Sequence, residues 1–213
     1  METTKWIETK VDMDSIDWKG NPIHLKNVPA LQNSKTGKIR VYPSEVAKAE
    51  VRNLAEQYCL ETRDVALLLL LYAKPGNFEK GKMYYQYHVN KSLFYLRKEL
   101  EKQKIADAFP MDEFETADRG PVPKNLEADL KRLTEKCIIS TRWREKRASK
   151  ITELTPQGLA VAEKLWEQIA DPIKVTTLKV KEWIFPLDPI TIRDRVHRDY
   201  PEYKKTYTKE DTA

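Results

Sequence analysis

The sequence predicts a mainly α-helical protein with a small β-hairpin, and two observations carry that prediction. Several segments place leucine, valine and aromatic residues at the i, i+4 and i+7 spacing of one helix face, with proline or glycine between the segments. Residues 138–154 instead hold two short β-type runs joined by a polar, basic connection. We therefore expect helices along most of the chain and one hairpin among them.

The first 42 residues show little periodicity, which predicts an irregular N-terminal extension. Two prolines and the turn-like segment Asn33–Lys38 interrupt it. We expect only short strands there, at Lys5–Lys10 and Lys38–Tyr42. Because the segment also carries Trp6 and Trp18, we expect it to pack on the rest of the protein instead of being disordered.

Three helices are predicted before residue 103. The first begins near Pro43, since proline is favoured in a first turn. The second is Glu61–Ala73, which stops before Pro75, and the third runs from about Tyr84 to Lys102. The apolar stripes are Ala47, Val51, Leu54 and Tyr58 in the first helix, and Val89, Leu93, Leu96 and Leu100 in the third.

The most informative segment follows a loop or poorly ordered strand at Ile105–Arg119. A fourth helix is expected over roughly Pro123–Lys136, and the strands Ile138–Trp143 and Lys150–Leu154 then form the hairpin. A fifth helix opens with Thr155 as its N-cap, before a proline. This order of helix, basic hairpin and capped helix is typical of a winged helix-turn-helix core, here with N- and C-terminal extensions.

The cap-then-proline signal recurs at Asp171-Pro172 and Asp188-Pro189, so two more short helices are expected, and Pro201 closes the last. The tail beyond Lys204 is expected to fray. We divide the chain into an irregular extension (1–42), a winged-helix domain (43–170) and a C-terminal helical extension (171–213). Aromatic residues are expected to seal the last helices onto the core: Trp183, Phe185, Tyr200, Tyr203 and Tyr207.

The composition indicates a globular protein with a mildly basic surface. Of the 213 residues, 40% are hydrophobic and 33% are charged, and the formal net charge is +5. That excess permits a polyanionic partner without requiring one. The longest apolar run, Val65–Ala73, has nine residues, whereas a membrane span needs about 20. With no signal-peptide core and two cysteines expected as free thiols, Cys59 and Cys137, we expect a cytoplasmic protein with no membrane partner.

No pattern in the sequence predicts catalysis. The three histidines, His24, His88 and His197, are isolated and lack the spacing of metal ligands. The sequence contains no glycine-rich phosphate loop and no nucleophile elbow. We therefore predict no enzyme activity, no catalytic residue, no metal site and no cofactor.

The fourth predicted helix carries hydrogen-bond donors away from its leucine stripe. A recognition helix in a DNA major groove needs long donors on that face. Acidic residues lie on the same helix, so an ordinary solvated helix of mixed charge is the alternative. The donors are Lys124, Asn125, Lys131 and Arg132, and the acids are Glu127, Asp129 and Glu135.

The hairpin is the more basic element. Five cations fall within nine residues, opposed there only by Glu145: Arg142, Arg144, Lys146, Arg147 and Lys150. Such cations can follow DNA phosphates and release their counterions. The alternative is an edge hairpin whose charges discourage pairing between molecules. We expect Trp143 to pack beneath the hairpin and not to stack on a base.

Three stretches of the sequence resemble known families. VNKSLFYLRKELEK (Val89–Lys102), the AFPMDEF loop and GPVPKNLEADLKRLTEKCII (Gly120–Ile139) resemble the winged-helix-like families that include YwgA-type proteins and the Panacea (SocA-like) antitoxin domain. DYPEY at Asp199–Tyr203 is similar to a C-terminal feature of the YwgA-type group. ITELTPQGLAVAEKL (Ile151–Leu165) is similar to the post-wing segment of MarR- and PadR-type regulators. The resemblance implies a winged-helix fold.

These observations favour a DNA-binding protein, a transcriptional regulator with double-stranded DNA as its partner. The donors of the fourth helix would enter a groove, and the hairpin cations would hold the flanking backbone. The alternative is a protein-interaction module, an antitoxin-like protein or an assembly subunit, that uses the same fold for a protein partner. A homodimer would suit DNA binding, because such regulators read paired half-sites, and the fifth helix or the C-terminal aromatics would form its interface.

Overall fold

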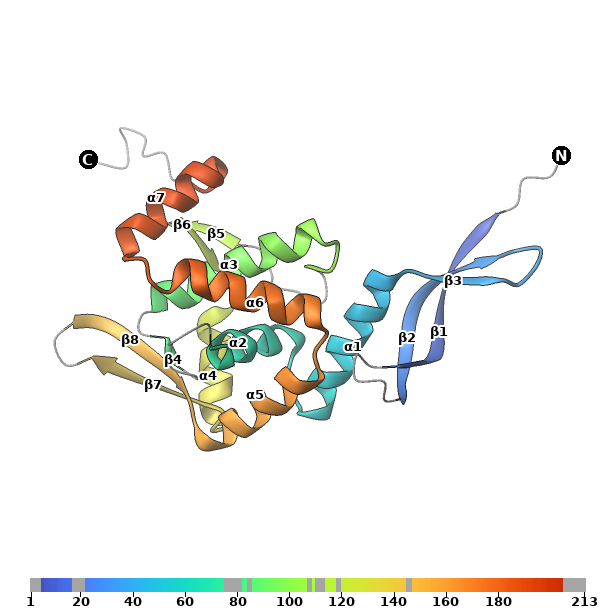
Figure 1. The fold of residues 1–213 in the computed structure, drawn as a ribbon, viewed down its shortest axis with the longest axis horizontal. Coiled ribbons are helices and arrows are strands. Elements are labelled where there is room, and N and C mark those ends of the chain that lie inside the picture. The colour runs from blue at the N-terminus through green and yellow to red at the C-terminus, as the bar shows by residue number, and fades with distance from the viewer. Residues whose placement is uncertain are drawn as a thin grey trace.

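The structure, a computed structural model, describes residues 5–16, 22–74, 82–83, 86–106, 109, 114–117, 120–144 and 147–204. Within these residues it has seven α-helices and three antiparallel sheets (Figure 1). The helices are α1 (Pro43–Gln57), α2 (Thr62–Tyr72), α3 (Gln86–Lys102), α4 (Leu126–Glu135), α5 (Pro156–Gln168), α6 (Asp171–Ile184) and α7 (Pro189–Asp199), followed by a 3-10 turn at Pro201–Tyr203. The N-terminal sheet has the strand order β1 (Trp6–Ile16), β2 (Pro22–Asn33), β3 (Ile39–Val41). The second sheet has the order β4 (Lys82–Met83), β8 (Arg147–Leu154), β7 (Ile139–Arg144). The third sheet pairs β5 (Phe114–Ala117) with β6 (Gly120–Pro123).

The predicted fold class is wrong. We expected a mainly α-helical winged helix-turn-helix core with one small hairpin, whereas the chain is a mixed α and β protein with three sheets. The largest departure is at the N-terminus, where the expected irregular extension forms two long strands, β1 and β2. The predicted helices are confirmed within a few residues at their ends, as are the two strands of the predicted hairpin.

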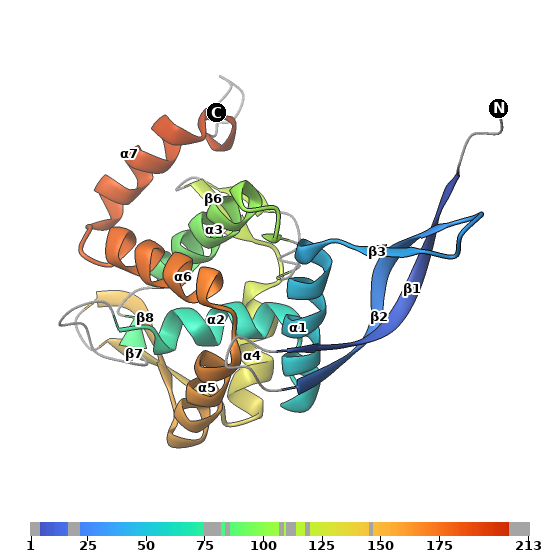
Figure 2. The same cartoon turned by 45° about the vertical axis from the view of Figure 1, so that its right-hand side comes forward.

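The N-terminal sheet projects from the helical body as an arm, with α1 between the two (Figures 1 and 2). One face of the arm packs on α1, because apolar residues alternate along its strands. This small core contains Leu25, Val28 and Ala49, with Val11 and Met13 packed against it.

The helical body has one continuous hydrophobic core that runs from Val51 in α1 to Val196 in α7. Helix α2 lies at its centre and contacts α1, α3, α5 and α6. Its apolar run is buried on all sides, as expected for a helix without a polar face. The proposed domain boundaries at residues 42 and 170 stay a prediction, although this core extends across the second of them.

Three of the predicted C-terminal aromatics, Phe185, Tyr200 and Tyr203, pack against the core as expected. Phe94 contacts Tyr200 and Tyr203 edge to face, with ring centroids 4.9 and 5.1 Å apart. Phe185 lies 6.0 Å from the ring of His88. Trp183 differs from its neighbours, because 40% of it is exposed. Tyr207 and the predicted frayed tail beyond Lys204 lie outside the described residues.

Two lysines are fully buried in the body. Lys91 donates a hydrogen bond to the carbonyl oxygen of Pro121 at 2.6 Å. Lys181 donates to the carbonyl oxygens of Leu71 and Ala73, at 3.1 and 2.5 Å, and so satisfies acceptors at the C-terminal end of α2. Burial lowers the pKa of each lysine to about 7, because the charged form loses its hydration.

These lysines predict that the free energy of unfolding rises with pH between pH 7 and about 9.5. In that range an unfolded lysine, with a pKa near 10.4, still holds a proton that the native lysine has released. The unfolded state therefore binds more protons, and stability increases by up to about 1.4 kcal/mol per pH unit for each lysine. Urea unfolding at several pH values in this range measures the slope of the free energy of unfolding against pH.

Lys181→Met should remove about half of that slope, because it leaves Lys91 as the remaining buried lysine of the pair. Lys164→Met, which changes an exposed lysine of α5, should keep the slope of the unmodified protein. If the stability of the unmodified protein did not change with pH in this range, the lowered pKa of the two buried lysines would be contradicted.

Candidate nucleic-acid interface

The β7–β8 hairpin carries most of the predicted contact residues. Its strands pair from Ile139↔Leu154 to Arg144↔Arg147, with a register shift between Trp143 and Arg144. The Arg142 side chain is 61% exposed and pairs with Glu153 at 2.9 Å, an exposed ion pair that holds the guanidinium only weakly. Arg144 and Arg147 are described through the pairing of their backbones, and Lys146 lies outside the described residues.

Trp143 does not pack beneath the hairpin as predicted. It is 65% exposed, and the Nζ atom of its cross-strand neighbour Lys150 lies 5.5 Å from the centre of its ring. The β7–β8 hairpin projects from the helical body toward its tip (Figure 1). An exposed indole beside cations is a surface on which a base or sugar could stack.

A groove separates this hairpin from the exposed face of α4. It has a volume of about 230 Å³ and brings the predicted contact residues Lys131 and Lys150 to one site. Acids lie beside both of them, because Lys150 is 3.7 Å from Glu127 and Lys131 is 3.9 Å from Glu135. The groove is lined by Glu127, Leu130, Lys131, Thr134, Glu135, Thr141 and Lys150.

Arg132 does not line this groove, so the structure does not bring it together with Lys131 and Lys150. Its guanidinium faces α2, where it pairs with Asp64 at 2.5 Å and with Glu61 at 3.1 Å. A third carboxylate, Asp129 of α4 itself, lies 2.9 Å away, and burial raises the pKa of that carboxyl. Arg132 therefore joins α4 to the N-terminal turn of α2.

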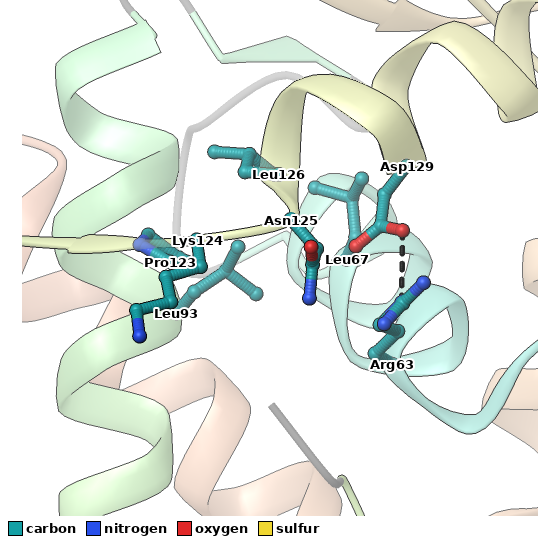
Figure 3. A pocket seen from close by; sticks show the side chains of 8 residues that line it. All are labelled: Arg63, Leu67, Leu93, Pro123, Lys124, Asn125, Leu126 and Asp129. Carbon is teal, nitrogen blue, oxygen red and sulfur yellow. Dashed lines mark ion pairs between the residues drawn. The ribbon is translucent and has the colours of Figure 1, made fainter. Parts of the chain in front are cut away.

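Lys124 and Asn125 precede the first turn of α4. Lys124 is exposed, and Asn125 occupies the N-cap position without a side-chain capping bond. Both border a small pocket whose far wall is the ion pair between Arg63 and Asp129, 2.8 Å apart (Figure 3). Its volume of about 20 Å³ suits a water molecule and is too small for an organic ligand or a base.

The histidines lie on three separate elements. His24 pairs with the carboxylate of Asp14 at 2.8 Å on the arm, and the Nε2 atom of His88 lies 2.9 Å from the carbonyl oxygen of Leu187. Burial lowers the pKa of His88 and of His197. Across the described ranges, no three His, Cys, Asp or Glu side chains gather closely enough to hold a metal ion. Both cysteines are free thiols, as predicted.

Comparisons with known proteins found no matching family model, no matching curated protein and no matching solved structure. In the part of the chain that the structure describes, no helix combines the length and the apolar character that a membrane crossing requires. The family resemblances of the sequence stay predictions, and a functional assignment depends on the residues themselves.

Proposed function

We propose that the protein binds double-stranded DNA through the β7–β8 hairpin, and that it acts as a cytoplasmic transcriptional regulator. The observation that carries the proposal is the gathering of cations on one projecting hairpin, with Arg142 and Trp143 exposed. Phosphate contacts supply affinity without reading bases, and cations on a ribbon can make them. Lys131 of α4 and Lys124, which precedes that helix, would contact the same duplex, whereas Arg132 would take no part.

A salt titration with a fluorescently labelled duplex tests this function. If the hairpin contacts phosphates, affinity should fall steeply as salt rises, with a slope of about −0.9 in log–log form for each phosphate neutralised. The triple variant Arg142→Glu, Arg144→Glu, Arg147→Glu should abolish measurable binding. Uncharged substitutions at the same three positions should reduce the magnitude of the salt slope by about 2.7.

The matched control changes three exposed lysines elsewhere to glutamate: Lys26, Lys38 and Lys164. It alters the net charge as much as the hairpin variant does, yet it should retain most of the affinity. Binding of random duplex weaker than about 0.1 mM at low salt would exclude the DNA function, because non-specific DNA binding is normally tighter than that.

A protein partner is the second candidate function, and the groove between α4 and the hairpin favours it. Its two lysines already lie near two glutamates, so the groove has mixed charge, which suits a protein surface better than a phosphate backbone. In that case, Glu127→Lys and Glu135→Lys together should disrupt the complex with the partner. The same pair of substitutions should instead strengthen DNA binding if DNA is the partner.

A further inference from the structure

Strand β1 is an edge strand whose outer side has no neighbouring strand in the described chain (Figure 1). It runs for 11 residues, whereas the opposite edge, β3, has three. An edge of this length presents a row of unpaired backbone groups, which other strands can pair with. Helix α1 packs mainly against β2 and so leaves this edge accessible.

The regular part of this edge is the segment Trp6–Val11. Over that segment β1 follows β2 without interruption, and the register shifts between Val11 and Met13. The shift is fixed by a hydrogen bond from the Asn27 backbone to the Asp12 carboxylate at 2.8 Å. The extra residue of this irregularity lies on β2, because the two-residue step from Val11 to Met13 in β1 faces the three-residue step from Val28 to Leu25 in β2.

Charges within this segment are arranged for pairing with an identical strand. Glu8 and Lys10 flank Thr9, and both charged side chains are exposed. If two copies pair antiparallel with Thr9 opposite Thr9, then Glu8 of each faces Lys10 of the other. Shifting the centre to Lys10 would oppose two lysines and would place Glu8 against Asp12.

The same register also matches the apolar residues. Ile7, which is 51% exposed, comes opposite Val11 of the second copy. Val11 lies on the α1 side of the sheet, where it packs against the small core of the arm, so this contact would extend that core across the interface. Two such arms would form one six-stranded antiparallel sheet with both α1 helices on the same face.

We propose that the protein forms a two-fold symmetric homodimer in which the β1 strands of two copies pair antiparallel about Thr9. The arm and the β7–β8 hairpin lie on opposite sides of the molecule, so the hairpins would lie at the two outer ends of the dimer (Figures 1 and 2). The interface does not use α5 or the C-terminal aromatics, and it does not depend on the proposed DNA function.

Sedimentation velocity of the full chain tests the pairing by charge reversal. Lys10→Glu alone places Glu8 against an acid, and Glu8→Lys alone places Lys10 against a base. Each variant should weaken the dimer about tenfold or more, because two symmetric pairs become repulsive at once. An equimolar mixture of the two variants should form a heterodimer, since every charged pair is then complementary again.

Lys26→Glu on β2 makes the same change of charge outside the interface and should leave the dimer intact. Recovery in the mixture also shows that both variants are folded. An unmodified chain that is still monomeric at about 1 mM would overturn the proposal. A dimer that persists in Lys10→Glu, or a mixture that stays monomeric while the unmodified chain dimerises, would also overturn it.

Discussion

Replacing Gly158 with alanine should destabilise the protein by about 3 kcal/mol or more. Gly158 is buried in the first turn of α5, where it faces the start of β7. A Cβ atom added there would lie 1.8 Å from the carbonyl oxygen of Ile138 and 2.8 Å from its carbonyl carbon. Because these are backbone atoms, no side-chain rotation can relieve the overlap.

The overlap would also break the hydrogen bonds that hold the start of α5 against the hairpin. The backbone N–H of Thr155 donates to the same Ile138 oxygen at 3.1 Å. The Thr155 hydroxyl donates to the carbonyl of Cys137 at 2.5 Å and accepts from the Gly158 N–H at 3.0 Å. A helix displaced from Ile138 loses its N-cap interaction as well as this connection.

Urea unfolding of Gly158→Ala against the unmodified protein measures the loss. Gln157→Ala is the matched control, because that residue is the exposed neighbour in the same helical turn. It should change the free energy of unfolding by less than about 0.5 kcal/mol. A Gly158→Ala protein as stable as the control would contradict the close approach of α5 and β7.

Local signals predicted the helical part of the fold well. Helix α1 begins at Pro43 and α5 at Pro156, where the prolines indicated, and Thr155 caps α5 through its side chain. Similarly, Asp188 caps α7 by accepting from the backbones of Ile190 and Thr191. These features depend on residues a few positions apart, which the sequence displays directly.

The short strands expected at Lys5–Lys10 and Lys38–Tyr42 coincide with the start of β1 and with β3, whereas the second half of β1 and all of β2 were missed. Residues 10–14 alternate polar and apolar, and Val11 and Met13 do face α1. Pro29 is an unfavourable residue for a strand, since proline is rare in the middle of a sheet. In the structure β3 pairs only with Ala30–Gln32, so β2 has a single neighbouring strand where Pro29 lies. That exception depends on strand order, which periodicity does not reveal.

The candidate site was only partly predictable for the same reason. Exposure of Lys131 and Arg142 follows from the stripe and hairpin patterns, and the structure agrees. The role of Arg132 depends on Asp64, a residue 68 positions earlier in the chain. Its other partner on the same helix, Asp129, is three residues away, but this spacing alone does not distinguish a surface pair from a buried network.

Arg132→Met should therefore reduce stability by about 3 kcal/mol, because it leaves the buried carboxylate of Asp64 without the cation that pairs with it. Asp64 is 1% exposed, and its other described contact is the backbone N–H of Glu61, which donates to it at 2.9 Å. Adding Asp64→Asn removes the stranded charge, so the double variant should regain at least about 1 kcal/mol relative to Arg132→Met alone.

Lys131→Met is the matched control on the same helix, since the Lys131 side chain is 79% exposed and its ion pair contributes little. Each variant should change the result of one assay and leave the other unchanged. Arg132→Met should lower the free energy of unfolding and leave the DNA affinity of the folded protein unchanged, whereas Lys131→Met should leave stability unchanged and weaken DNA binding. If Arg132→Met were as stable as the unmodified protein but bound DNA more weakly, Arg132 would contact DNA as the sequence first suggested, and the ion-pair network with α2 would not hold it.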